Sequence, residues 1–345
     1  MATNSQRKKK GEKKPQKPLA TMITKDFFQG KIKANAKQIF PMVVIATMSS
    51  GKSTLINALM GEELLPAQNA ACTDKRFCIL NDDTVQKSKL YLMDRNRNIV
   101  LKENCLKEEL VKANDDEEIA DILIYSCIKG ILNTDKSLLI IDTPGPNNSM
   151  NSSHESKMKE ILQDIKGGLV LCVLDATQPG TTDSKHLLET LYKYRVENPQ
   201  VKMIFVLNKI DEIDLEKESL EQQISAARND LIANGFDSPN IIPLSALAVN
   251  IFKKVLHNDE LTDFERRKFE WFYELYGADK LSMASYAITE DCRNMFETIS
   301  VHGKDYKVAD IMQAIDNTGF RLLENEIQKA QIKNGKHAVN TIQVK

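Results

Sequence analysis

Residues 46 to 54 read Ala-Thr-Met-Ser-Ser-Gly-Lys-Ser-Thr and follow directly on the apolar run Val43-Val44-Ile45. A short buried strand, a turn of small residues and a helix opened by Lys-Ser-Thr are the parts of a phosphate-binding loop. Such a loop works because backbone N–H groups at a helix N-terminus point at phosphate oxygens. The stretch therefore predicts a nucleoside triphosphate site, followed by an amphipathic helix over Leu55 to Met60 that ends at Gly61.

The residues of this loop have separate predicted roles. Lys52 places a positive charge on the β- and γ-phosphates, and the Ser53 hydroxyl is a ligand for Mg²⁺. The residues predicted to contact the nucleotide here are Met48, Ser49, Ser50, Gly51, Lys52, Ser53 and Thr54. The usual pattern begins with Gly, whereas this chain has Ala46, whose methyl group fits if its φ angle is negative. The alternative interpretation is that Gly-Lys-Ser after a strand is accidental.

A second apolar run, Leu138 to Ile141, ends in Asp142-Thr143-Pro144-Gly145. A nucleotide fold of this kind needs an acidic residue after a second strand, because the metal must be held there. We expect Asp142 to reach Mg²⁺ through a water and the Gly145 N–H to bond the γ-phosphate, so that loss of this phosphate releases the following loop. The alternative is a simple turn after a strand.

A third apolar strand ends in Asn208-Lys209-Ile210-Asp211. The Asp211 carboxylate accepts two hydrogen bonds from N1–H and the N2 amine of guanine, a donor pair that adenine lacks. Asn208 is expected to tie this loop to the phosphate loop, and the Lys209 stem to lie against the base. A fourth strand is followed by Ser245-Ala246, where the Ala246 N–H is expected to meet the guanine oxygen. The four loops together predict GTP rather than ATP.

With these four loops the chain resembles GTPases of the P-loop class and, more narrowly, bacterial members of the dynamin family, over roughly residues 35 to 330. The stretches that carry the narrower resemblance are Ala46 to Leu59 (ATMSSGKSTLINAL), Leu64 to Thr73 with its Ala-Cys-Thr end, Asp142 to Ser149 (DTPGPNNS) and Asn317 to Glu324 (NTGFRLLE). The resemblance implies that Thr73 is the switch threonine, whose hydroxyl ligates Mg²⁺ and whose carbonyl helps to hold the attacking water. The predicted catalytic residues are Lys52, Thr73, Gly145 and Ser49, and the predicted metal ligands are Ser53, Thr73 and Asp142.

Two sequence features bear on the rate of GTP hydrolysis and on the pairing of GTPase domains. Dynamins usually carry a polar residue, often Gln, followed by Ser where this chain has Met48-Ser49. A thioether cannot orient a water as an amide does, so this task falls to Thr73, to backbone groups or to a group supplied in trans, and we expect slow hydrolysis. The resemblance also implies that the loop Asp175 to Asp183 reaches across a pair of GTPase domains, which predicts self-association. The alternative is a polar loop whose Asp183 caps a helix over Ser184 to Glu197.

Composition limits the function classes. The chain has 345 residues and six cysteines without a C-x-x-C pair, so the sequence suggests neither a zinc site nor a disulfide framework and indicates a reduced, cytoplasmic protein. No apolar run approaches the roughly 18 residues of a transmembrane helix. Residues 1 to 20 form a predicted disordered basic arm with Arg7-Lys8-Lys9-Lys10. Its alternatives are a solvated tail or a contact with an anionic membrane or another polyanion, which would place the protein peripherally at a membrane.

The alternation of elements predicts an α/β fold of the P-loop GTPase type. The sheet is doubly wound and mainly parallel, with helices on both faces and helical insertions. The predicted regions are a basic arm at 1–20, a leading helical segment at 21–40, the GTPase domain at 41–315 with helical insertions near 104–133 and 250–312, a closing helix at 316–335 and a tail at 336–345. The stripe Phe264, Trp271, Phe272, Leu275 and Tyr276 predicts an amphipathic helix packed on this domain, with Trp271 buried. The stalk of full dynamins has no counterpart before Lys345, so we do not expect membrane remodelling.

Three functional hypotheses remain. The first is a dynamin-like GTPase that binds GTP with Mg²⁺, releases GDP and phosphate, and is stimulated by pairing of its GTPase domains. The second is a small regulatory GTPase of the ribosome-assembly kind, which is weakened because no RNA-binding loop follows Ser245. The third is a non-catalytic GTP-dependent scaffold, suggested by Met48.

Overall fold

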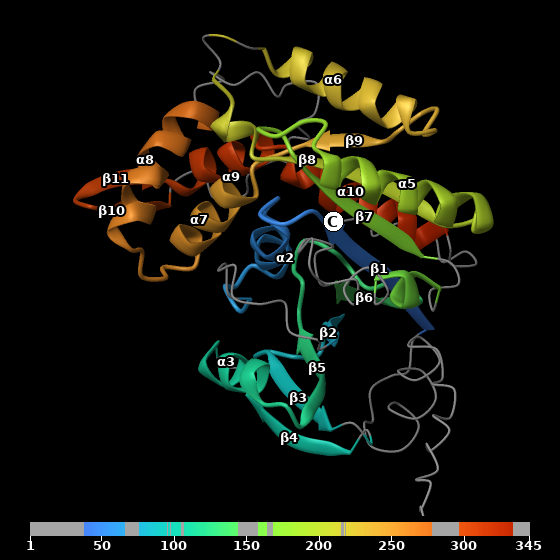
Figure 1. Cartoon of the computed structure of the whole chain (residues 1–345). Helices are drawn as coiled ribbons and strands as arrows, with labels where there is room; N and C mark the ends of the chain where they lie inside the picture. The colour runs from blue at the N-terminus through green and yellow to red at the C-terminus, as the bar shows by residue number, and fades with distance from the viewer. Residues whose placement is uncertain are drawn as a thin grey trace, which may run out of the picture.

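The computed structural model describes residues 38–65, 76–94, 96, 98–104, 107–143, 158–163, 168–214, 217, 219–277 and 297–333. Nine strands form one sheet in the order β4-β3-β5-β2-β6-β1-β7-β8-β9, and β10 and β11 form a separate hairpin (Figure 1). The strands are β1 Gln38–Ala46, β2 Arg76–Asn81, β3 Lys89–Asp94, β4 Ile99–Asn104, β5 Ile119–Ser126, β6 Lys136–Asp142, β7 Leu169–Asp175, β8 Lys202–Asn208, β9 Ile241–Pro243, β10 Thr298–Val301 and β11 Lys304–Lys307. The helices are α2 Lys52–Met60, α3 Lys107–Asp115, α5 Thr182–Glu197, α6 Leu220–Ala233, α7 Ala246–Leu256, α8 Asp263–Gly277, α9 Val308–Asn317 and α10 Phe320–Lys333, with a 3₁₀ turn η2 at Ile210–Glu212.

The central part of the sheet is parallel and brings the predicted loops to one edge. β1 pairs in parallel with both β6 and β7, and its register places Val44 beside Asp142. β8 continues the parallel pairing, so that Asp175 at the end of β7 lies beside Asn208. The carboxyl ends of β1, β6, β7 and β8 therefore meet, which is where α/β sheets bind their ligands. The predicted α/β, mainly parallel fold is confirmed.

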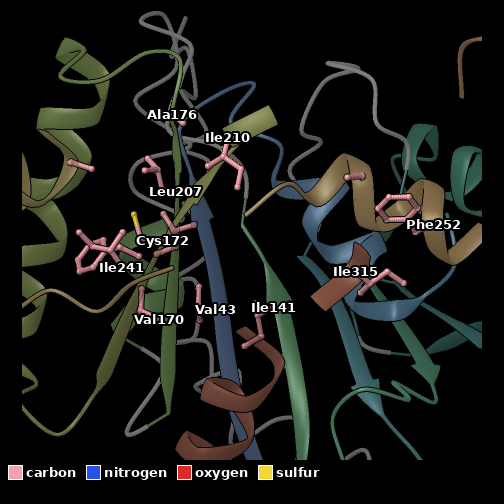
Figure 2. Close-up of a cluster of buried hydrophobic side chains, with 14 of the residues drawn as sticks. Val43, Ile141, Val170, Cys172, Ala176, Leu207, Ile210, Ile241, Phe252 and Ile315 are labelled. Atoms are coloured by element: carbon pink, nitrogen blue, oxygen red, sulfur yellow. The ribbon is translucent and has the colours of Figure 1, made fainter. Parts of the chain in front are cut away.

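Two hydrophobic cores cover the two faces of this sheet. Alternate residues of β1 point to opposite faces, with Val43 in one core and Val44 in the other. Figure 2 shows the first core, where Ile141, Val170 and Cys172 lie near Val43. Helices α5 and α6 cover that face, whereas α2, α3 and α10 cover the other. The doubly wound arrangement follows from this two-sided burial.

The predicted helical insertion at 104–133 is partly wrong. Only α3 is helical there, and β5 is a strand that pairs in parallel with β2 and antiparallel with β3. The run Ile-Ala-Asp-Ile-Leu-Ile-Tyr-Ser in β5 is rich in β-branched and aromatic residues, and it is buried almost throughout. Such residues favour a central strand, and insertion of β5 between β2 and β3 extends the sheet beyond the predicted strands.

The predicted helical insertion at 250–312 also needs correction. It contains α8 and parts of α7 and α9, but β10 and β11 form an antiparallel hairpin within it. The turn of this hairpin has left-handed backbone at His302 (φ 56) and Gly303 (φ 77), as two-residue hairpin turns require.

Helix α8 carries aromatic residues on two faces rather than one. Phe269, Phe272 and Tyr276 are buried, as expected of a helix packed on the domain, whereas Trp271 is 41% exposed and Phe264 51% exposed. The prediction that Trp271 is buried is therefore wrong. The Lys268 ammonium lies 4.6 Å from the centre of the Trp271 ring, a cation–π contact that suits an exposed aromatic side chain.

The ends of the chain are described only in part. The basic arm, residues 21–37 of the predicted leading segment, the last two residues of the predicted closing helix and the tail at 336–345 lie outside the described residues. Residues 38–40 are the start of β1 rather than helix. The predicted closing helix at 316–335 begins later than expected, because α9 ends at Asn317 and α10 starts at Phe320, after Gly319 with a φ of 82°. Within the described residues, no helix has the length and apolar character needed to span a bilayer.

Candidate nucleotide-binding site

The phosphate loop has the backbone that its sequence predicts. Gly51 is the N-cap of α2 with a φ of 86°, and Ser49 is also left-handed with a φ of 63°. The hydroxyl groups of Thr47 and Ser50 lie 2.6 Å apart and close the loop on itself. Ala46 ends β1 without a positive φ, so its methyl group is accommodated in the core. The first N–H groups of α2 follow directly on this loop, where a helix N-terminus favours an anion.

The acidic residue of the second motif lies against the lysine of the first. The Lys52 ammonium donates to Asp142 Oδ1, and both side chains are largely buried. Thr143 holds the end of β6 against β1, because its hydroxyl donates to the Val44 carbonyl at 2.8 Å. A carboxylate and the Ser53 hydroxyl are hard oxygen donors of the type Mg²⁺ prefers, so these residues fit the predicted metal. Thr73 and Gly145 lie outside the described residues.

Asn208 joins the phosphate loop to the loop after β9. Its amide Nδ2 donates to the Ser50 carbonyl at 2.8 Å, which is the predicted tie between the two loops. Its Oδ1 accepts from the Ala246 N–H at 3.0 Å. We expected that N–H to meet the guanine oxygen, whereas here it is engaged by Asn208. A side chain on Gly51 would break this junction, because its Cβ would lie 2.3 Å from Asn208 Nδ2.

Asp211 is a buried carboxylate with an open oxygen. It lies in η2 and is 6% exposed, and its Oδ2 has no hydrogen-bond partner among the described residues. Burial raises the pKa of Asp211, while the nearby Ser245 hydroxyl opposes that shift. Ser245 itself caps α7 and accepts from the Ala248 N–H at 3.2 Å. A buried carboxylate oxygen without a partner is costly, and the donor pair of guanine would satisfy it.

Lys209 is placed differently from our expectation. Its backbone is left-handed with a φ of 66°, and its ammonium forms an ion pair with Asp175 Oδ2 at 2.7 Å. Asp175 also accepts from the backbone and hydroxyl of Thr177, so it anchors the start of the loop that follows β7. Sequence reasoning missed Asp175 as a partner of the base loop. The sequence feature that could have indicated this contact is the position of Asp175 at the end of β7, the strand that pairs with β8.

The residue that caps α5 differs from the expected Asp183. Helix α5 begins at Thr182, and its N-cap is Thr181, whose hydroxyl accepts from the Ser184 N–H at 3.2 Å. Asp183 lies inside the first turn rather than at the cap, where its negative charge still complements the helix dipole.

A cavity of about 700 Å³ lies away from these loops, at the C-terminal end of α2. Its lining includes Gly61, Lys253 and Glu324. The four predicted loops are at the other end of α2, so this cavity is not the nucleotide site.

The chain is similar to known proteins. Residues 42–210 match the model of the dynamin family. A curated relative, an uncharacterized protein in the xynA 3' region of Caldicellulosiruptor sp. (strain Rt8B.4), is 28% identical over 237 residues, which are 68% of this chain and 54% of the relative. This chain thus spans about half the length of that relative.

Two solved structures illustrate the structural likeness. One comes from an oligomerised bacterial dynamin pair for which long-range sensing and tethering of membranes is described, at 21% identity over 71% of this chain and 39% of that one, with a TM-score of 0.46. The other is the G domain of the T. maritima FeoB iron transporter, at 18% identity over 61% of this chain and 89% of that one, with a TM-score of 0.30.

Proposed function

This chain carries a dynamin-family GTPase domain, and we propose that it binds GTP with Mg²⁺ and hydrolyses it to GDP and phosphate, at a rate raised by pairing of two such domains. The observation that carries the proposal is the Asn208 bridge, which ties the phosphate loop to the two loops expected to hold the base. A chance Gly-Lys-Ser turn has no reason to be joined in this way to a buried carboxylate with an open oxygen.

The proposed chemistry assigns a separate task to each loop. Lys52 and the N–H groups at the start of α2 stabilise the charge that develops on the transferred phosphate. Ser53, Thr73 and Asp142 would hold Mg²⁺, which would supply positive charge to the phosphates when bound. Lys52 is paired with Asp142, so phosphates must compete with Asp142 for the lysine. Thr73 and Ser49 help to place the attacking water, and the Gly145 N–H bonds the γ-phosphate.

Base recognition rests on the second group of loops. We propose that Asp211 binds N1–H and the N2 amine of guanine. The contact requires ionised Asp211; burial raises the pKa of this carboxyl, and the donors of the base would oppose that shift. Asn208, Lys209, Ser245 and Ala246 surround the same position, with Lys209 held at its far end by Asp175. Binding of the base then requires only a small rearrangement of the Ala246 N–H away from Asn208.

Pairing is proposed for the face that carries the loop after β7. The ion pair between Asp175 and Lys209 links this loop to the base loop, so a partner that contacts the loop would act on the nucleotide site. Self-association through this face would raise a rate that Met48 otherwise keeps low.

The test is phosphate release from GTP, measured at several protein concentrations with Mg²⁺ and again with the metal chelated. We expect specific activity that rises with protein concentration and is lost without Mg²⁺. A flat, slow rate would favour the regulatory GTPase, and tight GTP binding without release would favour the scaffold. The Lys52→Ala variant, purified in the same way, is the control for contaminating phosphatases.

We further propose a cytoplasmic protein that contacts anionic membranes peripherally through its basic arm, residues 1–20. Co-sedimentation with anionic and neutral vesicles tests this in the full chain and in a chain that starts at residue 21. Binding that depends on the arm and falls with salt is expected, because the attraction is electrostatic. Equal binding by both chains would contradict it.

A further inference from the structure

Two polar atoms of the base loop and of helix α8 are buried without a hydrogen-bond partner among the described residues. The Tyr276 side chain at the end of α8 is fully buried, and its hydroxyl has no hydrogen-bond partner among the described residues. Asp211 Oδ2 is the other such atom. The two groups interact electrostatically, and the Ser245 hydroxyl lies close to both. Buried hydroxyl and carboxylate groups are almost always hydrogen-bonded in folded proteins, so this pair requires an explanation.

Tyr276 is held firmly in this position. The Asn317 side-chain amide donates to the Tyr276 carbonyl at 2.7 Å and thereby fixes the end of α8 to the end of α9. The ring packs against Phe272, with 6.3 Å between the ring centres. Neither contact involves the phenol oxygen, so both fix the residue without satisfying its hydroxyl.

The hydroxyl is a permanent donor at this position. Burial raises the pKa of Tyr276 well above its usual value, and the negative charge of Asp211 raises it further. The other charged groups near Asp211 are Glu212, which disfavours its ionised form, and Lys268, which favours it. A phenylalanine would fill the same space without burying an unpaired hydroxyl, as Phe269 and Phe272 do earlier on the helix. The oxygen of Tyr276 therefore needs a function beyond packing.

We propose that Tyr276 is a positioning residue for guanine recognition, whose buried hydroxyl confines the Asp211 carboxylate from the side of α8 so that Oδ2 faces N1–H and the N2 amine of the base. The inference rests on the proposed function. It assigns to α8, a helix far from the four nucleotide loops in sequence, a part in selecting the base.

The geometry makes a specific distinction between purines. Guanine presents two donors to the carboxylate, whereas xanthine carries a carbonyl oxygen in place of the N2 amine and would face Asp211 with repulsion. A well-oriented carboxylate therefore separates GDP from XDP more strongly than a loosely held one. The quantity that Tyr276 controls is the ratio of the two dissociation constants.

The experiment is a titration of the full chain with GDP and XDP, in the wild type and in the Tyr276→Phe variant. We expect Tyr276→Phe to weaken GDP binding about tenfold, to leave XDP binding nearly unchanged, and so to lower the GDP/XDP preference about tenfold. Tyr273→Phe is the matched control, because it removes a hydroxyl from the same helix that bonds Asp310 at 3.1 Å instead. Its preference should stay within about twofold of the wild type.

The Asp211→Asn variant distinguishes failure of the Tyr276 inference from failure of the proposed guanine site. This variant should bind XDP, and adding Tyr276→Phe to it should change XDP binding by less than about twofold, because the carboxylate is gone. An unchanged GDP/XDP preference in Tyr276→Phe, or equal losses for both nucleotides, would assign Tyr276 to packing alone and overturn the inference. A tenfold loss of XDP binding in the double variant would overturn it as well. Failure of Asp211→Asn itself to gain XDP would reject the base site, and with it this inference.

Discussion

The phosphate end and the base end of this site are built in different ways. The phosphate end is almost continuous in sequence, because residues 46–54 form the loop and the start of α2, and Asp142 adds one distant side chain. The base end is assembled from separate segments, around Asp211, Ser245 and Tyr276. Affinity for phosphate therefore depends on local backbone geometry, whereas selection of the base depends on how helices pack. A substitution that disturbs helix packing should lower the selectivity for the base before it lowers the affinity for phosphate.

The largest expected effect is at the phosphate end. Lys52→Ala should lower GTP affinity roughly a thousandfold, since hydrogen bonds to charged groups contribute about 1.5–3 kcal/mol each and 1.4 kcal/mol is tenfold. Titration with a fluorescent GTP analogue measures it. Lys107→Ala removes a lysine that pairs with Glu63 on the surface and should bind normally. Retained micromolar binding in Lys52→Ala would reject the assignment of the phosphate loop.

The next largest effect is at the base end. Asp211→Asn should weaken GTP binding about a hundredfold and make xanthosine triphosphate the better ligand, because an amide pairs with the carbonyl oxygen of xanthine. Competition between the two nucleotides measures the change. Asp214→Asn, in the same loop but on the surface with Lys217, is the control. Asp211→Asn leaves the contacts of the phosphate end in place. An unchanged preference for GTP over xanthosine triphosphate would therefore contradict the role of Asp211, but not the assignment of the phosphate loop.

Gly51→Ala tests the junction between the two ends. Its left-handed φ of 86° alone costs of order 1–3 kcal/mol with a side chain, and the added Cβ would also displace Asn208. We expect a lower melting temperature and at least tenfold weaker binding of both GDP and XDP. Gly303→Ala carries the same backbone strain, with a φ of 77°, but its Cβ would meet nothing within 4 Å. Equal effects on nucleotide binding in the two variants would show that the Asn208 junction does not matter.

The difference between the two ends also explains what the sequence could predict. Each loop follows an apolar strand, so the order of the loops along the chain predicted the mainly parallel sheet. Asn208 was expected to tie its loop to the phosphate loop, and its partner there, the Ser50 carbonyl, came from the structure. The ion pair of Lys209 with Asp175 was missed, because it depends on the strand register between β7 and β8. The strand β5 was read as helix, because a buried apolar run has the same composition in both.

Helix α8 has two features that its sequence pattern could not predict, one on the surface and one beside the base loop. Its aromatic residues lie on two faces, so the pattern alone could not decide that Trp271 is exposed while Phe272 beside it is buried. Nothing in the local sequence of Tyr276 indicates that it lies beside Asp211. Both facts come from the packing of α8 against α7 and α9, which one sequence does not specify.

The smallest expected effect concerns the rate rather than binding, and it belongs to the phosphate end alone. Met48 is 54% exposed in the phosphate loop, and its thioether accepts hydrogen bonds only weakly. Met48→Gln introduces an amide that both donates and accepts, so it should raise GTP turnover about threefold to tenfold by orienting the attacking water. GDP affinity should not change, because Met48 contacts the nucleotide mainly through its backbone in the proposed complex. Met48→Leu keeps the apolar side chain and should turn over GTP at the wild-type rate. If Met48→Gln is no faster in single-turnover measurements, the water is oriented from another group, and raising the protein concentration then tests whether that group comes from a paired domain.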